Sequence, residues 1–159
     1  MQGGLSARCA AIDQVLAIEG VQGKAVPNIM ASMWQKFAAI CGMGIFSVVR
    51  GDAATLRRAP ETFNLVLAAI REGIDVAAAR GVYLDSALLN YVKTFLEGLP
   101  GSFKPSMLVD LEHGRRLEVE ALNGTLSRLG REVGVPTPVN DFIYACLKPY
   151  ATGVDSHSG

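Results

Sequence analysis

NIMASMWQKFAAICGMGIFSVV, residues 28–49, is the segment from which the architecture follows. Apolar side chains recur in it at steps of three and four, and Pro27 suits a helix start, so it predicts one long helix. Residues 37–49 carry no charge, but these thirteen residues are fewer than the roughly 20 that a membrane-spanning helix needs. We therefore expect a buried core helix and no membrane partner. Gly42 and Gly44 each weaken it by about 1 kcal/mol relative to alanine, which predicts a kink or a close helix contact.

On either side of this segment the chain continues as a series of helices. Apolar periodicity and terminating glycines or prolines predict further helices over about 5–19, 60–80, 86–97 and 139–147, with a short turn over 52–58. Another helical stretch is expected from Ser106 to Gly134, with weak points at Gly114 and Gly124. No segment alternates with period two, so the predicted fold class is all-α.

The composition is that of a folded domain without a charge bias. The chain has 159 residues, of which 50% are apolar, with 15 basic and 15 acidic side chains. This is enough for one core, so residues 1–150 are expected to form one helical domain and residues 151–159 a flexible tail. A balanced charge provides no global field for nucleic acid or an anionic membrane, and we expect neither partner. The N-terminus has no secretory pattern, which favours a cytoplasmic location.

The cysteines and glycines indicate no metal or nucleotide site. Cys9, Cys41 and Cys146 are an odd number and have apolar neighbours, as expected of reduced, packed thiols. There is no CxxC pair, and His113 and His157 lie far from any cysteine in sequence, so no metal is expected. The phosphate-binding patterns GxGxxG and GxxxxGK[ST] are also missing, and the chain has no motif of its own for holding a nucleotide.

Lys36 is the first candidate functional residue, because it is the only charged residue between Lys24 and Arg50. One interpretation packs its stem and leaves the amine in water, which needs no function. Alternatively, the ammonium lies in a cleft where partial desolvation suits it to proton transfer. Ile40 and Gly44 follow one and two turns later on the same face, and neither side chain can hydrogen-bond a ligand.

The second candidate is the charged run SMLVDLEHGRRLEVEALNG, residues 106–124. Solvated pairs four residues apart, such as Glu112 with Arg116, explain much of it without a function. Ser106 is explained as a helix cap, and His113 beside a glycine as an exposed turn residue. No spacing in the run supports a serine nucleophile with its base and orienting acid.

The same run carries a family resemblance. Together with GVPTPVN at 134–140 it resembles the signature of the C-terminal domain of ketopantoate reductase (2-dehydropantoate 2-reductase), and WQK at 34–36 resembles the family's W-x-K. Arg71-Glu72 and Ala79-Arg80-Gly81 resemble its mid-domain helix. The resemblance implies a helical bundle like the C-terminal half of the 6-phosphogluconate dehydrogenase group. It also implies NADPH-dependent reduction of a 2-keto acid to a 2-hydroxy acid in pantothenate biosynthesis.

The resemblance also assigns roles to individual residues. Lys36 matches the general acid that protonates the developing alkoxide, and an ammonium suits that role. Ser106 and Glu118 match residues that bind the substrate or orient the lysine. Ile40 and Gly44 stand where the family has substrate-binding asparagines, so discrimination in favour of ketopantoate itself is expected to be weakened.

The length suggests that only the second half of such a reductase is present. The Rossmann domain that binds NADPH is expected to be absent, so the isolated chain should not reduce a substrate without a separate Rossmann-domain chain. The alternative is a non-catalytic helical protein that keeps the fold for oligomerisation or for binding a small acid. Ile40 and Gly44 favour the alternative, whereas Lys36, Ser106 and Glu118 favour the reductase. In either case an uncovered face makes a homodimer reasonable.

Overall fold

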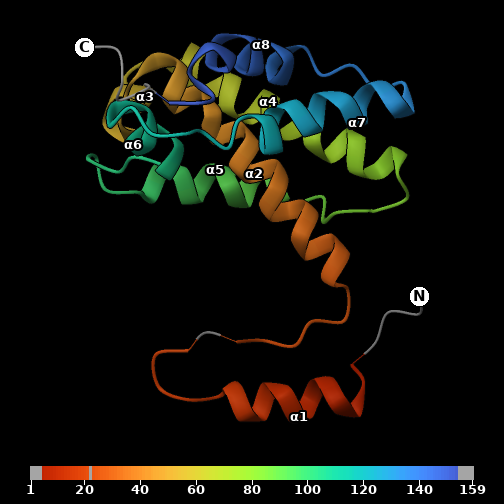
Figure 1. The fold of residues 1–159 in the computed structure, drawn as a ribbon. Coiled ribbons are helices and arrows are strands. Elements are labelled where there is room, and N and C mark those ends of the chain that lie inside the picture. The colour runs from red at the N-terminus through yellow and green to blue at the C-terminus, as the bar shows by residue number, and fades with distance from the viewer. Residues whose placement is uncertain (1–4, 22, 154–159) are drawn as a thin grey trace.

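The computed structural model describes residues 5–21 and 23–153, and within these ranges the chain forms helices and turns with no strand. The all-α prediction is therefore confirmed. Figure 1 shows the elements, of which η1 is a π-helix and η2 a 3-10 helix. In chain order they are α1 (Ala7–Leu16), α2 (Ile29–Val49), α3 (Ala53–Arg57), α4 (Pro60–Ala79), α5 (Leu88–Gly98), α6 (Ser106–Glu112), η1 (Glu120–Gly124), α7 (Thr125–Val133), α8 (Pro138–Leu147) and η2 (Lys148–Tyr150).

Helix α2 is the central element, and its predicted bounds of about 28–49 are confirmed. It begins where the Asn28 side-chain oxygen accepts the backbone N–H of Ala31 at 3.1 Å. It ends at Arg50, whose φ of 50° lies in the left-handed region. Helix α4 is its main neighbour, with α8, α6 and η1 around the rest. Length and hydropathy alone would also suit a membrane crossing, but eight α2 residues are buried in the bundle, as in a core helix.

The two α2 glycines mark close helix contacts. A Cβ at Gly42 would stand 2.5 Å from Ile70 Cγ1 and 2.8 Å from the Val66 carbonyl oxygen, both on α4. A Cβ at Gly44 would stand 2.7 Å from Ile143 Cγ2 on α8. Carbon atoms normally approach to about 3.5–4.0 Å, so only glycine lets the backbones lie this close. The predicted close contact is confirmed at both positions.

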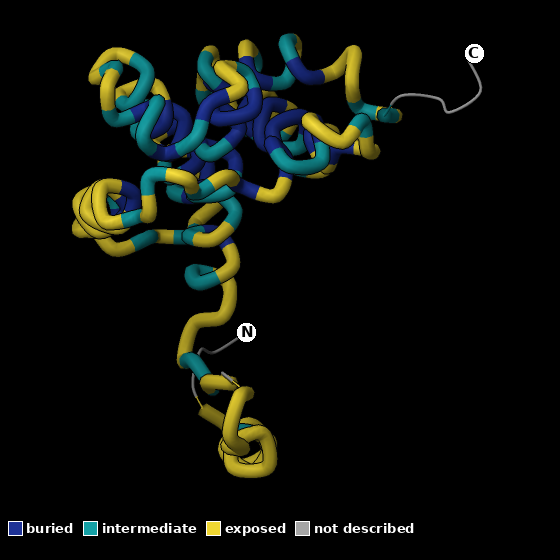
Figure 2. The backbone as a smooth tube through the Cα atoms, turned by 90° about the vertical axis from the view of Figure 1, so that its left-hand side faces the viewer, coloured by how far each residue is buried: buried dark blue, intermediate teal, exposed yellow. Residues whose placement is uncertain are grey.

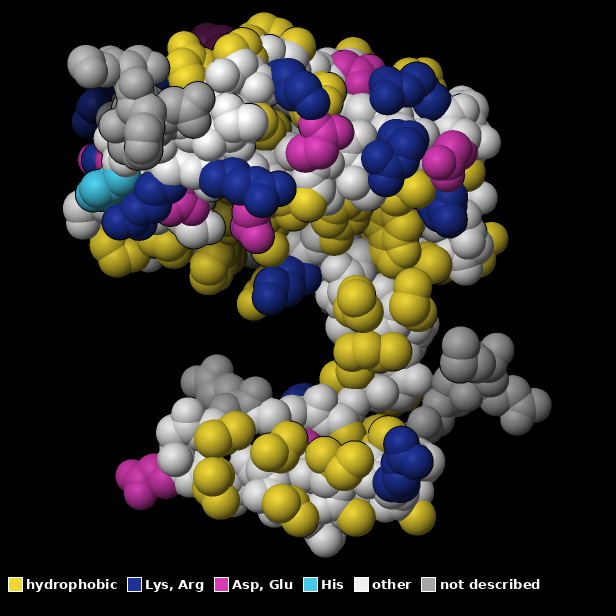
Figure 3. Space-filling model, in the orientation of Figure 1, with side chains coloured by type: hydrophobic (Ala, Val, Ile, Leu, Met, Phe, Trp, Pro, Cys, Tyr) yellow, Lys and Arg dark blue, Asp and Glu magenta, His cyan; other side chains and the backbone are white. Residues whose placement is uncertain are grey.

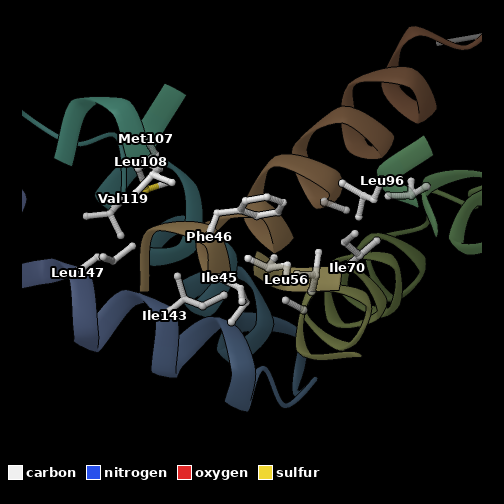
Figure 4. Packing of buried hydrophobic residues seen from close by; sticks show 14 of the residues in the cluster. Ile45, Phe46, Leu56, Ile70, Leu96, Met107, Leu108, Val119, Ile143 and Leu147 are labelled. Carbon is white, nitrogen blue, oxygen red and sulfur yellow. The ribbon is translucent and has the colours of Figure 1, made fainter. Parts of the chain in front are cut away.

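The hydrophobic core surrounds the C-terminal half of α2. Figure 4 shows Ile45 and Phe46 among side chains from α3, α4, α6 and α8. Trp34 and Cys41 belong to a smaller cluster with α4 and α7 residues. Burial of the Cys41 side chain raises the pKa of its thiol. Figure 2 shows that the buried backbone is gathered inside this bundle.

A buried polar network ties four elements together. The Glu72 carboxylate, on α4, accepts the backbone N–H of Val139 at 2.8 Å and that of Asn140 at 3.0 Å, at the start of α8. It also accepts the Asn140 side-chain amide at 2.6 Å. Asn123, in η1, donates through Nδ2 to Asn140 Oδ1 at 2.9 Å and to the Cys41 carbonyl at 3.0 Å. The network fixes η1 and α8 against α2 and α4.

The stretch from Ser106 to Gly134 differs from the prediction of one interrupted helix. Helix α6 ends at Glu112, and Gly114, with φ of 65°, turns the chain before η1 and α7 form. Glu112 therefore pairs with Lys104 at 2.7 Å, whereas the prediction paired it with Arg116. The helix-cap explanation of Ser106 is also wrong. Pro105 occupies the cap position, and no side-chain hydrogen bond caps α6.

The two ends of the chain also differ from expectation. Residues 151–153 do not form a free tail, because the Leu117 N–H donates to the Ala151 carbonyl at 3.0 Å. Residues 154–159 lie outside the described residues. Cys9, expected to be packed, is exposed on α1. No α1 residue is buried, and Figures 1 and 3 show this helix apart from the bundle with hydrophobic side chains on its surface.

Candidate functional site

A pocket of about 410 Å³ lies between α2 and the segment that carries α6 and η1. Pockets for small ligands typically measure about 300–1,000 Å³, so this one can enclose a small organic acid. One wall is α2, which contributes Lys36, Ile40 and Met43 at steps of four and three, on a single helix face. The opposite side comes from the loop before α6, the first turn of α6 and η1.

The three residues predicted from sequence line this one pocket. Lys36, Ser106 and Glu118 come from three separate segments, and the fold brings all three to the pocket wall. All three are exposed residues. Within the described residues Lys36 and Glu118 form no direct ion pair, although both line the pocket.

Local structure explains how Glu118 faces the pocket. Its neighbours Leu117 and Val119 are buried with 3% and 0% of their surface exposed, and they anchor the segment to the core. The Glu118 side chain is exposed in the turn that enters η1, and it lines the pocket. The Glu118 carbonyl accepts the Leu122 N–H at 2.9 Å and so leads directly into η1.

The remaining lining residues are apolar. Of these, only Ile40 was expected near the site from the sequence. Met43 could have been predicted from its helical spacing to Lys36. The lining residues from the loop before α6 and from η1 could not, because only the tertiary structure brings them to the pocket. The apolar set is Ile40, Met43, Phe103, Pro105, Met107 and Leu122.

The two positions that depart from the family pattern lie in different environments. Ile40 lines the pocket. Gly44 is buried in the contact between α2 and α8, where a Cβ would also stand 3.2 Å from Asn123 Oδ1. That oxygen has no hydrogen-bond partner among the described residues. Only Ile40 can therefore change what a ligand in this pocket contacts.

A second hollow, of about 560 Å³, lies between α2 and α5. Lys36 and Met43 line both hollows, so Lys36 stands on the ridge that separates them. The far wall carries Tyr91 and Phe95, which are 69% and 47% exposed. Lys36 is the only basic residue in its lining, as it is in the first pocket, and Ser32, Gln35 and Tyr91 add neutral hydrogen-bond donors.

No metal centre is found in the part of the chain that the structure describes, where no three His, Cys, Asp or Glu side chains are grouped to hold an ion. His113 is exposed after the end of α6, and its Nδ1 lies 2.6 Å from the Val109 carbonyl. The interpretation of His113 as an exposed turn residue is confirmed.

Comparison with known proteins gives matches over most of the chain. The family model described as "Ketopantoate reductase PanE/ApbA C terminal" matches residues 28–151, the range that begins just before α2. The 2-dehydropantoate 2-reductase of Archaeoglobus fulgidus is 28% identical over 155 residues, which are 97% of this chain and 52% of that protein. The chain thus spans about half the length of this relative.

Solved structures show the same likeness. A dimeric ketopantoate reductase from Staphylococcus aureus aligns with a TM-score of 0.83 at 27% identity, over 92% of this chain and 51% of the other. A D-mandelate dehydrogenase, solved with NADH and anilino(oxo)acetate, aligns with a TM-score of 0.80 at 25% identity, over 91% of this chain and 62% of the other. With the family model matched over most of its length, this chain belongs to the ketopantoate reductase C-terminal domain family.

Proposed function

We propose that this chain is the substrate-binding and proton-donating half of a reductase that converts a 2-oxo acid into a 2-hydroxy acid. The supporting observation is the convergence of Lys36, Ser106 and Glu118 on one pocket of suitable volume. Family membership supports the same class of reaction, since the matched relatives are 2-dehydropantoate 2-reductases.

Each of the three side chains has a task in this proposal. The Lys36 ammonium hydrogen-bonds the keto oxygen, stabilises the negative charge that develops on it, and donates the proton that completes the hydroxyl group. The Ser106 hydroxyl donates to the substrate carboxylate. The Glu118 carboxylate accepts a hydrogen bond from the product hydroxyl.

A nicotinamide cofactor would supply the hydride, and the related D-mandelate dehydrogenase was solved with such a cofactor, NADH. The described residues do not fit such a cofactor, because they form no strand and contain no glycine-rich turn between a strand and a helix to hold a pyrophosphate. We therefore assign this chain no step in nucleotide binding. That task would fall to a Rossmann domain, supplied by the portion of the relatives that this chain does not span.

Reconstitution tests the proposal. The chain is mixed with the separately expressed nucleotide-binding half of the Archaeoglobus fulgidus relative, and NADPH oxidation is followed with 2-dehydropantoate and with simpler 2-oxo acids. A direct fusion of the two halves serves as a second format. We expect 2-oxo acid-dependent turnover that falls at least 100-fold in Lys36→Ala. Lys93→Ala is the matched control, since Lys93 is an exposed lysine on α5 outside the pocket.

The Michaelis constant separates the other two roles. Ser106→Ala and Glu118→Gln should raise the KM for the 2-oxo acid more than they lower kcat, because both groups contact the bound substrate. Turnover that persists in Lys36→Ala would remove the proton-donor assignment. Binding of 2-oxo acids without turnover in either format would favour the non-catalytic small-acid-binding alternative.

A further inference from the structure

The wall of the pocket is divided into a polar mouth and an apolar floor. Lys36, Ser106 and Glu118 are exposed, whereas Ile40 and Met43 are half-buried. The other apolar lining residues are half-buried or buried, down to 6% exposure for Met107. Six of the nine lining residues are apolar, and all six are half-buried or buried.

This division orients a bound 2-oxo acid. Its carboxylate and keto oxygen need hydrogen-bond donors, and the donors among the lining side chains are Lys36 and Ser106 at the mouth. Placing the carboxylate on the floor instead would bury a charge against Ile40, Met43 and Leu122 with no counter-ion. The substituent on carbon 3 of the acid therefore points to the floor.

The side chains of the floor can neither donate nor accept a conventional hydrogen bond. A hydroxyl group placed there loses its water and finds no replacement partner in Ile40, Met43 or Leu122. A methyl group in the same place gains contact with them. Resting on the proposed function, we infer that this site takes 2-oxo acids with branched apolar side chains in preference to hydroxylated ones, and that Ile40 is the residue that sets this preference.

Ile40 is singled out by its position. It lies one helical turn beyond Lys36 on the same face of α2, so it contacts the part of the ligand next to the keto carbon. A polar side chain at this position would reach the floor of the pocket. Gly44 has no such access, because Ile143 and Asn123 already occupy the space beside it.

A pair of ligands that differ in one group provides the test. 2-Dehydropantoate carries a CH2OH group on its dimethylated carbon 3, and 3,3-dimethyl-2-oxopentanoate carries CH2CH3 at the same place, so a methyl group replaces the hydroxyl group. Each is titrated into the ¹⁵N-labelled full chain, and dissociation constants are taken from shifts of backbone amides around the pocket. We expect the methyl compound to bind at least tenfold more tightly, as for a hydroxyl left without a partner.

Two variants test whether Ile40 determines the preference for the apolar compound. Ile40→Asn should reduce the ratio of the two dissociation constants to about threefold or less, or reverse it, since its amide can pair with the hydroxyl group. Ile29→Asn is the matched control, because Ile29 is 58% exposed on the same helix and outside the pocket. It should leave the wild-type ratio unchanged. The wild-type ratio needs no variant, so the inference stays testable if Ile40→Asn fails to fold.

The outcomes for the two proposals can be told apart. Equal affinity of the wild type for both compounds, with both weakened by Lys36→Met, overturns the apolar preference and leaves the proposed function standing. A tenfold preference that Ile40→Asn does not alter removes Ile40 as the determinant. The absence of binding by either compound, or binding that Lys36→Met leaves unchanged, overturns both.

Discussion

Gly42→Ala tests whether the approach of α2 to α4 depends on the missing side chain. The added Cβ would stand 2.5 Å from Ile70 Cγ1 and 2.8 Å from the Val66 carbonyl oxygen. Relief to the usual 3.5 Å or more requires a shift of about 1 Å. Ile70 is fully buried and the Val66 oxygen is backbone, so α4 itself has to move.

The expected loss follows from two opposing effects. Overpacking a tight core costs about 1–3 kcal/mol and more where backbone must shift, so we take about 3–4 kcal/mol here. The gain in helix propensity from glycine to alanine returns about 1 kcal/mol. The free energy of unfolding should therefore fall by about 2–3 kcal/mol, measured by urea unfolding followed by circular dichroism.

Gly98→Ala is the control for the propensity gain alone. Gly98 ends α5, and a Cβ there would meet nothing within 4 Å. This variant should be neutral or more stable by up to about 1 kcal/mol. In a double-mutant cycle, Gly42→Ala should cost less when Ile70 is already alanine, because one of the two clashes is gone. An unchanged or increased stability of Gly42→Ala would refute the packing argument.

Three further changes probe polar contacts. Glu72→Gln replaces one accepting oxygen with a donor in the buried network and should lower the free energy of unfolding by about 2–3 kcal/mol in urea; a loss under about 0.5 kcal/mol would contradict this. Arg57→Met keeps the stem but removes the donor to the Leu99 carbonyl beyond α5, and should cost about 1 kcal/mol by the same measurement. The Lys148 ammonium lowers the pKa of Glu120, so this carboxylate stabilises the fold above its ordinary pKa of 4.5 and less as the pH falls. The Tm difference between wild type and Glu120→Gln should therefore shrink below about pH 4.5, and a difference independent of pH would contradict the assignment.

Local signals predicted the elements that have clear ends. Pro27 and Pro60 indicated helix starts; α2 begins two residues after Pro27, and α4 begins at Pro60. The segment from Ser106 to Gly134 was harder, because its apolar residues keep a helical spacing across a turn that Gly114 makes with positive φ. Periodicity does not distinguish an α-helix with weak points from a helix, a turn and a π-helix in succession.

The sequence alone could not predict contacts between residues that lie far apart in the chain. Glu72 was named only as part of the family's mid-domain helix, and its hydrogen bond to Asn140 spans 68 positions of sequence. A single sequence gives no means of pairing them. The site residues were found from other signals. Lys36 was identified as the only charged residue between Lys24 and Arg50, and the roles of Ser106 and Glu118 came from the family resemblance. The fold places all three at one pocket.

Ile40 and Gly44 both depart from the family pattern, but the two departures have different structural consequences. The glycine at position 44 affects helix packing, because Ile143 and Asn123 fill the space that a side chain would take. The isoleucine at position 40 affects ligand contacts, because its side chain lines the same pocket as Lys36 and Ser106. The proposed site combines a cation and a hydroxyl donor at its mouth with an apolar floor. The combination is what a reductase would need after exchanging a hydroxylated substrate for an apolar one.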